Sequence, residues 1–391
     1  MTGQSTPGTI GQPGTSGLDG LDGARVIYVA AERSAGGVGA YSEVFADMLR
    51  RRLTDFHEVR HPRPGTDTVT DLRARRREII ELIDAADGRP VVVHGEFSGG
   101  SVESFWPTAG LERIRRGVLV SATVHDPPGL VWWPGRVAFL ERRRFLNHAV
   151  HFPLRPLSRA IERRVVGART LFAMSHAGAR SLLRAYPDTT VRHAHMPVWS
   201  RGEVVAAPDR PKAVGLFGLV YRGKGFEHVE RLRGVLPDDI AIRIAGRGTE
   251  ALPGLDGVEI LGGVDDADLP AYFSSVRALV VPYGTRSLYG EAFPGSSVVS
   301  DAIAHLTPVV CTGHGALGEL RTEGGVLVVE EGGRTHEETV DALASAAAEL
   351  VTSRDRLSAM GEALKEMREV REPDEVVRTY LDTWARALCR A

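Results

Sequence analysis

The chain has 391 residues, of which 43% are hydrophobic, and a formal net charge of −2. This length is too great for one ordinary core and fits two domains of ~150 residues each. The near-neutral charge argues against general nucleic-acid binding, and no stretch approaches the ~20 uninterrupted apolar residues of a membrane span. The two cysteines, Cys311 and Cys389, have no metal-type spacing and no secretory leader is visible, so we expect a protein of the reducing cytoplasm.

The first half of the chain alternates between expected strands and helices. Residues 1–23 are rich in Gly, Thr, Ser and Pro, which predicts a disordered tail. An N-terminal domain over 24–205 follows. Its first apolar strand leads through a glycine loop into a helix over 41–52. This alternation predicts a parallel sheet with helices on both faces. The expected strands are 25–30, 91–94, 118–121, 170–174 and 191–194.

A second set of strands begins after residues 200–212, where Pro208 and Pro211 indicate a linker. We expect a C-terminal domain over 206–372, with an alanine-rich helix over 337–351, and a last helix over 373–391 that begins at Pro373. The chain is therefore predicted to be an α/β protein with two Rossmann-like domains facing each other across a cleft. The expected strands are 213–217, 240–245, 258–261, 278–281, 309–311 and 325–329.

A glycine-rich loop, Gly36-Gly37-Val38-Gly39, follows the first expected strand and opens a helix. Glycines there let backbone N–H groups approach an anion, with the positive helix end behind them. Gly37 and Gly39 are therefore candidate ligand contacts. The loop is not a complete dinucleotide fingerprint, because Ser42 stands where the third glycine is required. A tight turn with no ligand is the alternative interpretation.

The loop that opens the second domain carries Gly218, Arg222 and Lys224 after a strand. Fixed cations at a strand end would stabilise the charge that develops on a departing diphosphate. Lys224 is one of only three lysines among 48 basic residues, which favours a position where a compact ammonium is preferred. A solvated basic turn is the alternative.

A third candidate region runs from 276 to 319 and combines a strand, a polar glycine loop with Glu291, a helix with Asp301 and another strand. Strand ends that open onto helix N-termini bind phosphates and sugars. Two carboxylates there suit the hydroxyls of a nucleotide-sugar. A glycosidase-like acid and base pair is disfavoured, because Asp301 lies a helical turn into its helix.

This region resembles the donor-binding signature of retaining glycosyltransferases of family 4 (group 1), which have the GT-B fold. The family pattern is Glu-x-Phe-Gly, with a second Glu eight positions after the first. Here the chain reads Glu291-Ala-Phe293-Pro294-Gly295, and the second acid is Asp301, with nine rather than seven residues between the two. Leu219 also stands where the family has an arginine, so Arg222 would take over its role.

The resemblance extends over about residues 25–390 and implies roles for individual residues. Glu291 would accept hydrogen bonds from sugar hydroxyls, and Asp301 would bind the ribose. His125, after another strand end, would reach the donor sugar or the reaction centre, although a purely structural histidine is the alternative. The candidate catalytic residues are His125, Arg222, Lys224 and Glu291, and the candidate donor-binding residues are Gly37, Gly39, Gly218, Arg222, Lys224, Glu291, Phe293, Pro294, Gly295 and Asp301.

Residues 136–169 form a separate basic segment, with nine arginines against two acids. An anionic acceptor or contact with a membrane surface is one interpretation. The one we favour is a solvated helical face that covers the first sheet, because charge runs are usually exposed.

Together these features predict a cytoplasmic, metal-independent, retaining glycosyltransferase without a cofactor. Its donor would be a nucleoside-diphosphate sugar and its acceptor a small molecule or glycan, in natural-product or cell-envelope biosynthesis. We expect Asp265 and Asp266 to cap a helix rather than to hold a metal ion. A pseudo-glycosyltransferase or a nucleotide-sugar epimerase of the same fold is the alternative, followed by a non-catalytic nucleotide-sugar binder. A nicotinamide oxidoreductase ranks last, no nucleic-acid partner is expected, and the oligomeric state stays open.

Overall fold

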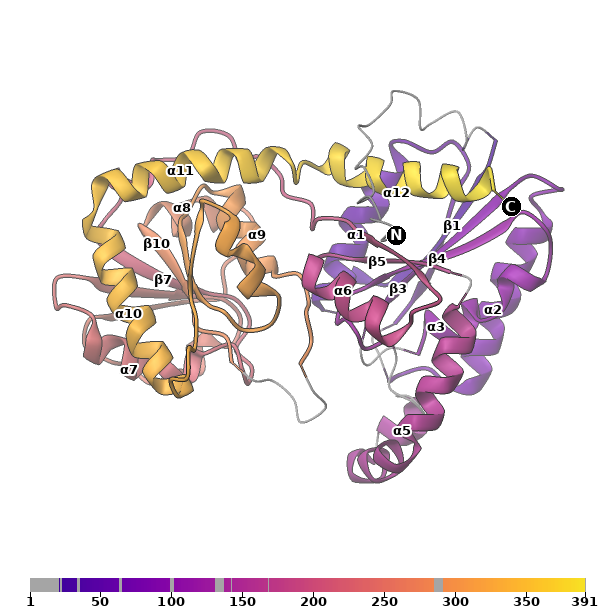
Figure 1. Ribbon diagram of the computed structural model, residues 1–391, viewed down its shortest axis with the longest axis horizontal. Helices are drawn as coiled ribbons and strands as arrows, with labels where there is room; N and C mark the ends of the chain where they lie inside the picture. Colours follow the sequence, from indigo (N-terminus) through magenta and orange to yellow (C-terminus); the bar gives the residue numbers. More distant parts are fainter. Residues whose placement is uncertain are drawn as a thin grey trace, which may run out of the picture.

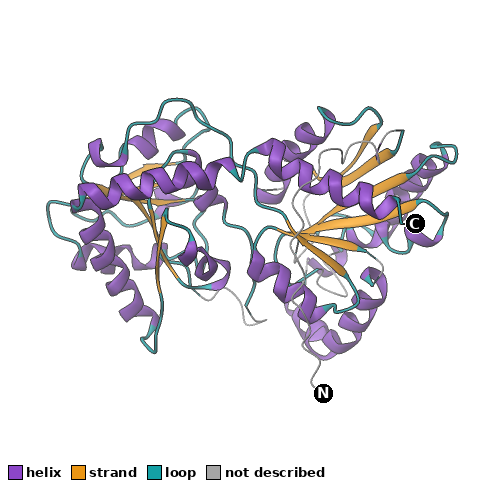
Figure 2. Cartoon of the chain, turned by 45° about the horizontal axis from the view of Figure 1, so that its top comes forward, coloured by secondary structure: helices purple, strands orange, loops and turns teal. Residues whose placement is uncertain are grey.

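The computed structural model describes residues 21, 23–33, 36–62, 65–98, 102–130, 137–141, 143–167, 169–284 and 291–390. The expected tail lies almost wholly outside the described residues. Within them, the chain forms two six-stranded sheets, each flanked by helices (Figures 1 and 2). The predicted α/β architecture with two Rossmann-like domains is confirmed.

The first sheet has the strand order β2-β1-β3-β4-β5-β6 and the second has the order β12-β11-β10-β7-β8-β9, with every strand pair parallel. Most strands are continuous buried runs, as a parallel sheet covered on both faces requires. The strands are β1 (Arg25–Ala31), β2 (Phe56–His61), β3 (Val91–Phe97), β4 (Val118–Val124), β5 (Thr170–Ala173), β6 (Thr190–His193), β7 (Ala213–Phe217), β8 (Ala241–Ala245), β9 (Val258–Gly262), β10 (Ala278–Val281), β11 (Val309–Thr312) and β12 (Val326–Val329).

The helices connect successive strands and cover both faces of each sheet (Figure 2). The α-helices are α1 (Gly37–Arg50), α2 (Val69–Asp84), α3 (Phe105–Thr108), α4 (Ala138–Glu141), α5 (Arg144–Val166), α6 (His176–Ala185), α7 (Val229–Val235), α8 (Leu269–Ser274), α9 (Ser297–Ala304), α10 (His336–Thr352), α11 (Arg354–Glu369) and α12 (Pro373–Leu388). Short 3-10 helices are η3 (Leu111–Arg113), η4 (Ala207–Asp209), η5 (Phe226–His228), η6 (Thr249–Ala251) and η7 (Gly315–Thr322).

Strand β2 is the one strand of the structure that the sequence pattern did not predict. Its sequence, FHEVRH, has only Val59 and His61 buried, and it forms one edge of the first sheet. An edge strand keeps one side in solvent, so its polar residues hide the apolar pattern on which the prediction depended.

The last two helices join the two halves of the molecule. Helix α11 lies over the second sheet, and α12 continues across to the first (Figure 1, yellow). Helix α12 contacts α1 and β4, and its apolar face completes the core beneath β1. The buried residues of α12 are Val376, Val377, Tyr380, Leu381, Trp384 and Ala385.

The basic segment 136–169 includes α4 and α5, and α5 projects from the first domain (Figure 1). On α5, Ser158 and Glu162 are buried, whereas Arg159, Arg163 and Arg164 are exposed. Among the helices in the described part of the chain, none has the length and apolar character needed to cross a bilayer.

Candidate active site

The candidate residues lie on loops that follow strands of both sheets. His125 directly follows β4, and the loop before α1 follows β1. In the second sheet, Lys224 follows β7, Glu291 follows β10, and the loop that leads into η7 follows β11. Strands β11, β10 and β7 are neighbours, so their three loops leave one edge of the sheet side by side.

Lys224 is held inside its loop rather than extended into solvent. Only 8% of the residue is exposed, and its ammonium group hydrogen-bonds the hydroxyl of Tyr283. The Nζ atom also lies 4.0 Å from the centre of the Tyr283 ring. Such cation–π contacts stabilise an ammonium that has lost part of its hydration. The loop therefore fixes one positive charge at the end of β7, while Arg222 in the same loop is exposed.

Glu291 belongs to the same edge of the second sheet. Its Oε1 accepts a hydrogen bond from the backbone N–H of Gly315, at 3.1 Å. Three residues before Gly315, Thr312 donates its hydroxyl to the carbonyl of Tyr283, at 2.7 Å. A short path of bonded residues thus connects Glu291 with Tyr283 and Lys224. The structure therefore places the predicted sugar-binding acid and the predicted phosphate-binding cation on adjoining loops.

The loop after Glu291 contacts the first domain. The N–H of Phe293 donates to the carbonyl of Pro127, and the hydroxyl of Ser175 donates to the carbonyl of Phe293, both at 2.8 Å. The amide of Phe293, which was expected near the donor, thus bonds to the first domain here. The next residues, Pro294 and Gly295, line an interdomain cavity described below.

Glu319 of η7 forms a second contact between the domains. Its carboxylate accepts hydrogen bonds from the N–H groups of His176 and Ala177, at 3.0 and 2.5 Å. These groups are the first of α6, whose positive end favours an anion. Glu319 therefore binds the start of a helix in the opposite domain.

The glycine loop before α1 contains two glycines with different surroundings. A Cβ atom on Gly39 would lie 2.0 Å from the carbonyl oxygen of Glu32, so only glycine fits there. A Cβ on Gly37 would meet nothing within 4 Å. No side chain caps the start of α1. Close packing explains Gly39, whereas the open space at Gly37 leaves room for a ligand.

Gly218 has a φ of +124°, a conformation that side chains rarely adopt. The loop after β8 packs against it, because a Cβ on Gly246 would lie 2.0 Å from the Gly218 carbonyl oxygen. Gly218 thus shapes the loop that carries Lys224.

His125 is 7% exposed, and its Nε2 lies 2.8 Å from Oε2 of Glu96, a fully buried side chain on β3. Its backbone N–H donates to the carbonyl of Phe97 at 2.8 Å. His125 is therefore fixed by the neighbouring strand through both its backbone and its ring.

Asp301 lies on α9 and is partly buried. Burial and the nearby Asp266 raise its pKa to about 7, against the opposing effect of Arg201. On α9, Val299, Ser300 and Ile303 line the interdomain cavity, and Asp301 projects from the opposite side of the helix. The expected capping by Asp265 and Asp266 is wrong, because Asp268 occupies the cap position of α8, without a side-chain hydrogen bond.

An interdomain cavity of about 190 Å³ lies beside the loop that contains Pro294 and Gly295. It is smaller than the ~300–1,000 Å³ typical of pockets that hold drug-sized ligands, so it cannot enclose a nucleotide-sugar. Burial lowers the pKa of His195 to about 3 and that of its neighbour His193 to about 4. The cavity is lined by Met174, Ser175, His176, His195, Met196, Pro294, Gly295, Ser296, Val299, Ser300, Ile303, Ala316, Leu317, Glu319, Leu320, Thr322, Glu323 and Arg371.

Four residues that bond candidate residues or join the two domains were not identified from the sequence: Glu96, Ser175, Tyr283 and Glu319. Glu96 had a visible signal, because His94 and Glu96 are polar residues at alternate positions of an otherwise apolar strand. Ser175 and Glu319 had none, since their bonds depend on how the two domains meet.

Comparison with known proteins relates the second domain to a family and the whole chain to a fold. Residues 217–353 match the family model described as glycosyl transferases group 1. No curated protein matches the chain. Among solved structures, HepE of Anabaena, in complex with UDP and glucose, is 14% identical, with 94% of this chain and 100% of that chain covered and a TM-score of 0.63.

Two further structures are similar. WaaG, a glycosyltransferase involved in lipopolysaccharide biosynthesis, is 13% identical over 92% of this chain and 99% of that chain, with a TM-score of 0.59. TarM is 11% identical with a TM-score of 0.51, and the alignment covers 75% of this chain but only 54% of TarM. At these identities the likeness concerns the fold.

Proposed function

We propose that this protein is a retaining glycosyltransferase that moves a sugar from a nucleoside-diphosphate sugar to an acceptor hydroxyl. The bond between the anomeric carbon and the diphosphate breaks, the acceptor oxygen bonds to the same face of that carbon, and the hydroxyl proton leaves with the diphosphate. The GT-B fold, the group 1 match over 217–353 and the UDP and glucose bound by HepE support this proposal.

The observation that carries the proposal is the pairing of Lys224 and Glu291 on adjoining loops of the second sheet. The ammonium of Lys224 is buried and held by Tyr283, so it is positioned before any substrate arrives. A preorganised cation stabilises the charge that grows on the departing diphosphate. With Arg222 in the same loop, this charge would replace a divalent ion, so we expect activity in the presence of a chelator.

Glu291 would accept hydrogen bonds from sugar hydroxyls beside the diphosphate. Its carboxylate is exposed and oriented by the N–H of Gly315. His125 would contribute a ring nitrogen from the first domain. The acceptor, a small molecule or glycan, would then enter between the domains, in natural-product or cell-envelope biosynthesis.

The first test replaces Lys224 by Ala. We expect kcat to fall about 100- to 1,000-fold, as for the loss of one group that stabilises transition-state charge. The matched control is Lys212→Ala, because Lys212 pairs with Asp239 on the surface and lies away from the site. Donors are first ranked by their effect on melting temperature, and release of the nucleoside diphosphate is then measured.

The product decides between the alternatives. The anomeric configuration, read by NMR, supports the proposal if it matches the donor. Interconversion of the donor sugar would indicate an epimerase, and coupling to a cyclitol a pseudo-glycosyltransferase. If the wild-type protein binds nucleotide-sugars yet releases no diphosphate with any acceptor, the proposal is wrong and a non-catalytic binder takes its place.

A further inference from the structure

Glu96 is an unusual residue for the interior of a parallel sheet. It lies on β3, a strand whose seven residues are all buried, and its side chain has no exposed surface. A buried carboxylate is costly unless charged or hydrogen-bonding partners surround it. Glu96 therefore requires an explanation beyond packing.

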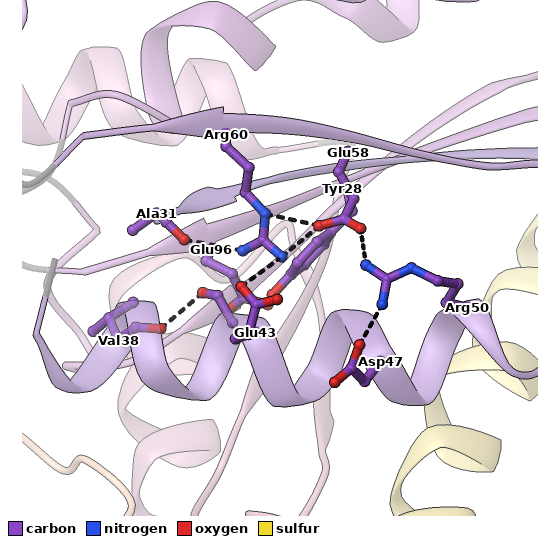
Figure 3. A network of polar contacts seen from close by, with 10 residues as sticks. Tyr28, Ala31, Val38, Glu43, Asp47, Arg50, Glu58, Arg60 and Glu96 are labelled. Carbon is purple, nitrogen blue, oxygen red and sulfur yellow. Dashed lines mark hydrogen bonds and ion pairs between the residues drawn. The ribbon is translucent and has the colours of Figure 1, made fainter. Parts of the chain in front are cut away.

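The partners of Glu96 occupy both of its oxygens. Tyr28 donates its hydroxyl to Oε1 at 2.9 Å, and the Nε2 atom of His125 lies 2.8 Å from Oε2. Figure 3 shows Glu96 beside Tyr28, between α1 and the sheet. Burial raises the pKa of Glu96, but hydrogen bonds from His125 and His94 outweigh burial and bring it to about 2. The group is therefore a carboxylate, which accepts hydrogen bonds only.

The Glu96 carboxylate determines which nitrogen of the neutral His125 ring carries the hydrogen. The Nε2 atom must carry a hydrogen to bond the carboxylate, so the neutral ring has its lone pair on Nδ1. The Nδ1 atom has no hydrogen-bond partner among the described residues, and 8% of the side chain stays exposed. After His125 the chain runs into Pro127, which bonds the second domain at Phe293.

Further hydrogen bonds connect the surroundings of Glu96 to β4 and α12. The ring of His94 lies 3.5 Å from Oε1 of Glu96 and hydrogen-bonds Ser121 and Thr123 of β4. Tyr380 and Trp384 of α12 bond the same two hydroxyls, at 3.2 and 3.0 Å. The network therefore runs from the last helix to His125.

We propose that Glu96 is a positioning residue, which holds His125 with Nε2 toward the protein interior and Nδ1 available to a substrate bound between the domains. This inference rests on the proposed transferase function for its kinetic consequence, but not for its structural one. In the transferase, Nδ1 would accept a hydrogen bond from a substrate hydroxyl, and a misplaced ring would slow the reaction without weakening donor binding.

The structural arm of the test is NMR on protein labelled with ¹⁵N in its histidines. Long-range ¹H–¹⁵N correlations report which ring nitrogen carries hydrogen, and His125→Gln identifies the His125 signals. We expect His125 to be protonated on Nε2 in the wild type. In Glu96→Gln the amide can donate instead of accept, so the Nδ1-protonated form should appear. The control Glu58→Gln changes a carboxylate on β2 that bonds Arg60 and Arg50, and should leave the His125 signals unchanged.

The kinetic arm uses the same variants. For Glu96→Gln we expect kcat to fall roughly 10- to 100-fold with donor KM within about twofold, as for loss of a group that orients another. Glu58→Gln should keep wild-type values. A wild-type ring protonated on Nδ1, or identical His125 signals in wild type and Glu96→Gln, overturns the inference whatever the activity. If the signals change as expected but the wild type transfers no sugar, the transferase proposal fails and the positioning role stands.

Discussion

At the scale of single residues, the surroundings of Asp301 disfavour the charged form of its carboxyl group. Its contribution to stability therefore depends on pH. Its pKa of about 7 lies well above the ~3.9 of an unfolded chain. The folded protein therefore binds one more proton than the unfolded chain between these two values. The stability that Asp301 contributes is present below about pH 4 and is lost as the pH rises through 7.

Replacing Asp301 by Asn removes this titration. Relative to the wild type, the variant should gain stability progressively from pH 4 to pH 8, by up to about 4 kcal/mol, since each pKa unit corresponds to ~1.4 kcal/mol. Urea unfolding at several pH values measures the difference. The exposed Asp256→Asn is the control and should show no such trend. A difference between Asp301→Asn and wild type that does not vary with pH would refute the account.

Arg210 shows that a charged side chain can be part of the protein interior. Arg210, in the expected linker, is 2% exposed and donates hydrogen bonds to the carbonyls of Phe273, Val276 and His305. Burial lowers its pKa to about 10, so it remains charged at neutral pH. Arg210 thus fastens the entry of the second domain to α8 and the loop before β11.

At the scale of elements, the start of α6 and the helix η7 form a direct contact between the domains through Glu319. Replacing Glu319 by Gln keeps the shape of the side chain but removes the charge that faces the positive end of α6. We expect a loss of roughly 1–2 kcal/mol, or about a tenfold shift toward molecules with separated domains. Small-angle X-ray scattering should then give a larger radius of gyration.

The control for this variant is Glu337→Gln, which breaks an ion pair with Arg231 inside the second domain. Its radius of gyration should equal that of the wild type. An unchanged radius for Glu319→Gln would contradict a role for this contact in holding the domains together.

The strands and helices also show how much of the fold and of the candidate site could be predicted from the sequence. Eleven strands were predicted because their sequences are apolar runs between glycines and helical segments, and most of these runs are buried. Lys224, His125 and Glu291 were placed after strand ends for the same reason. The bond between Glu96 and His125 depends on the pairing of β3 with β4, which alternation along one strand does not reveal. The face of α9 that carries Asp301 likewise depends on the packing of that helix, so the partly buried position of Asp301 was not foreseen.

At the scale of the whole molecule, α12 joins the two halves by adding its apolar face to the first core. Trp384→Ala should lower the free energy of unfolding by about 3–5 kcal/mol, because the indole is fully buried and also bonds Ser121. Hydrogen exchange should accelerate in β1 and β4 and stay slow in β10 and β11. The control Arg386→Ala, on the exposed side of the same helix, should change neither. Equal acceleration in both sheets would contradict the assignment of α12 to the first core.

The crossing of α12 also has a consequence for biosynthesis. The strands of the first sheet have all been translated by residue 193, yet the helix that seals their core begins at residue 373. At the usual 5–20 residues per second, the nascent sheet would wait roughly 10–40 s with an apolar face uncovered. A ribosome-bound chaperone that shelters this face would then serve the protein until α12 emerges from the exit tunnel.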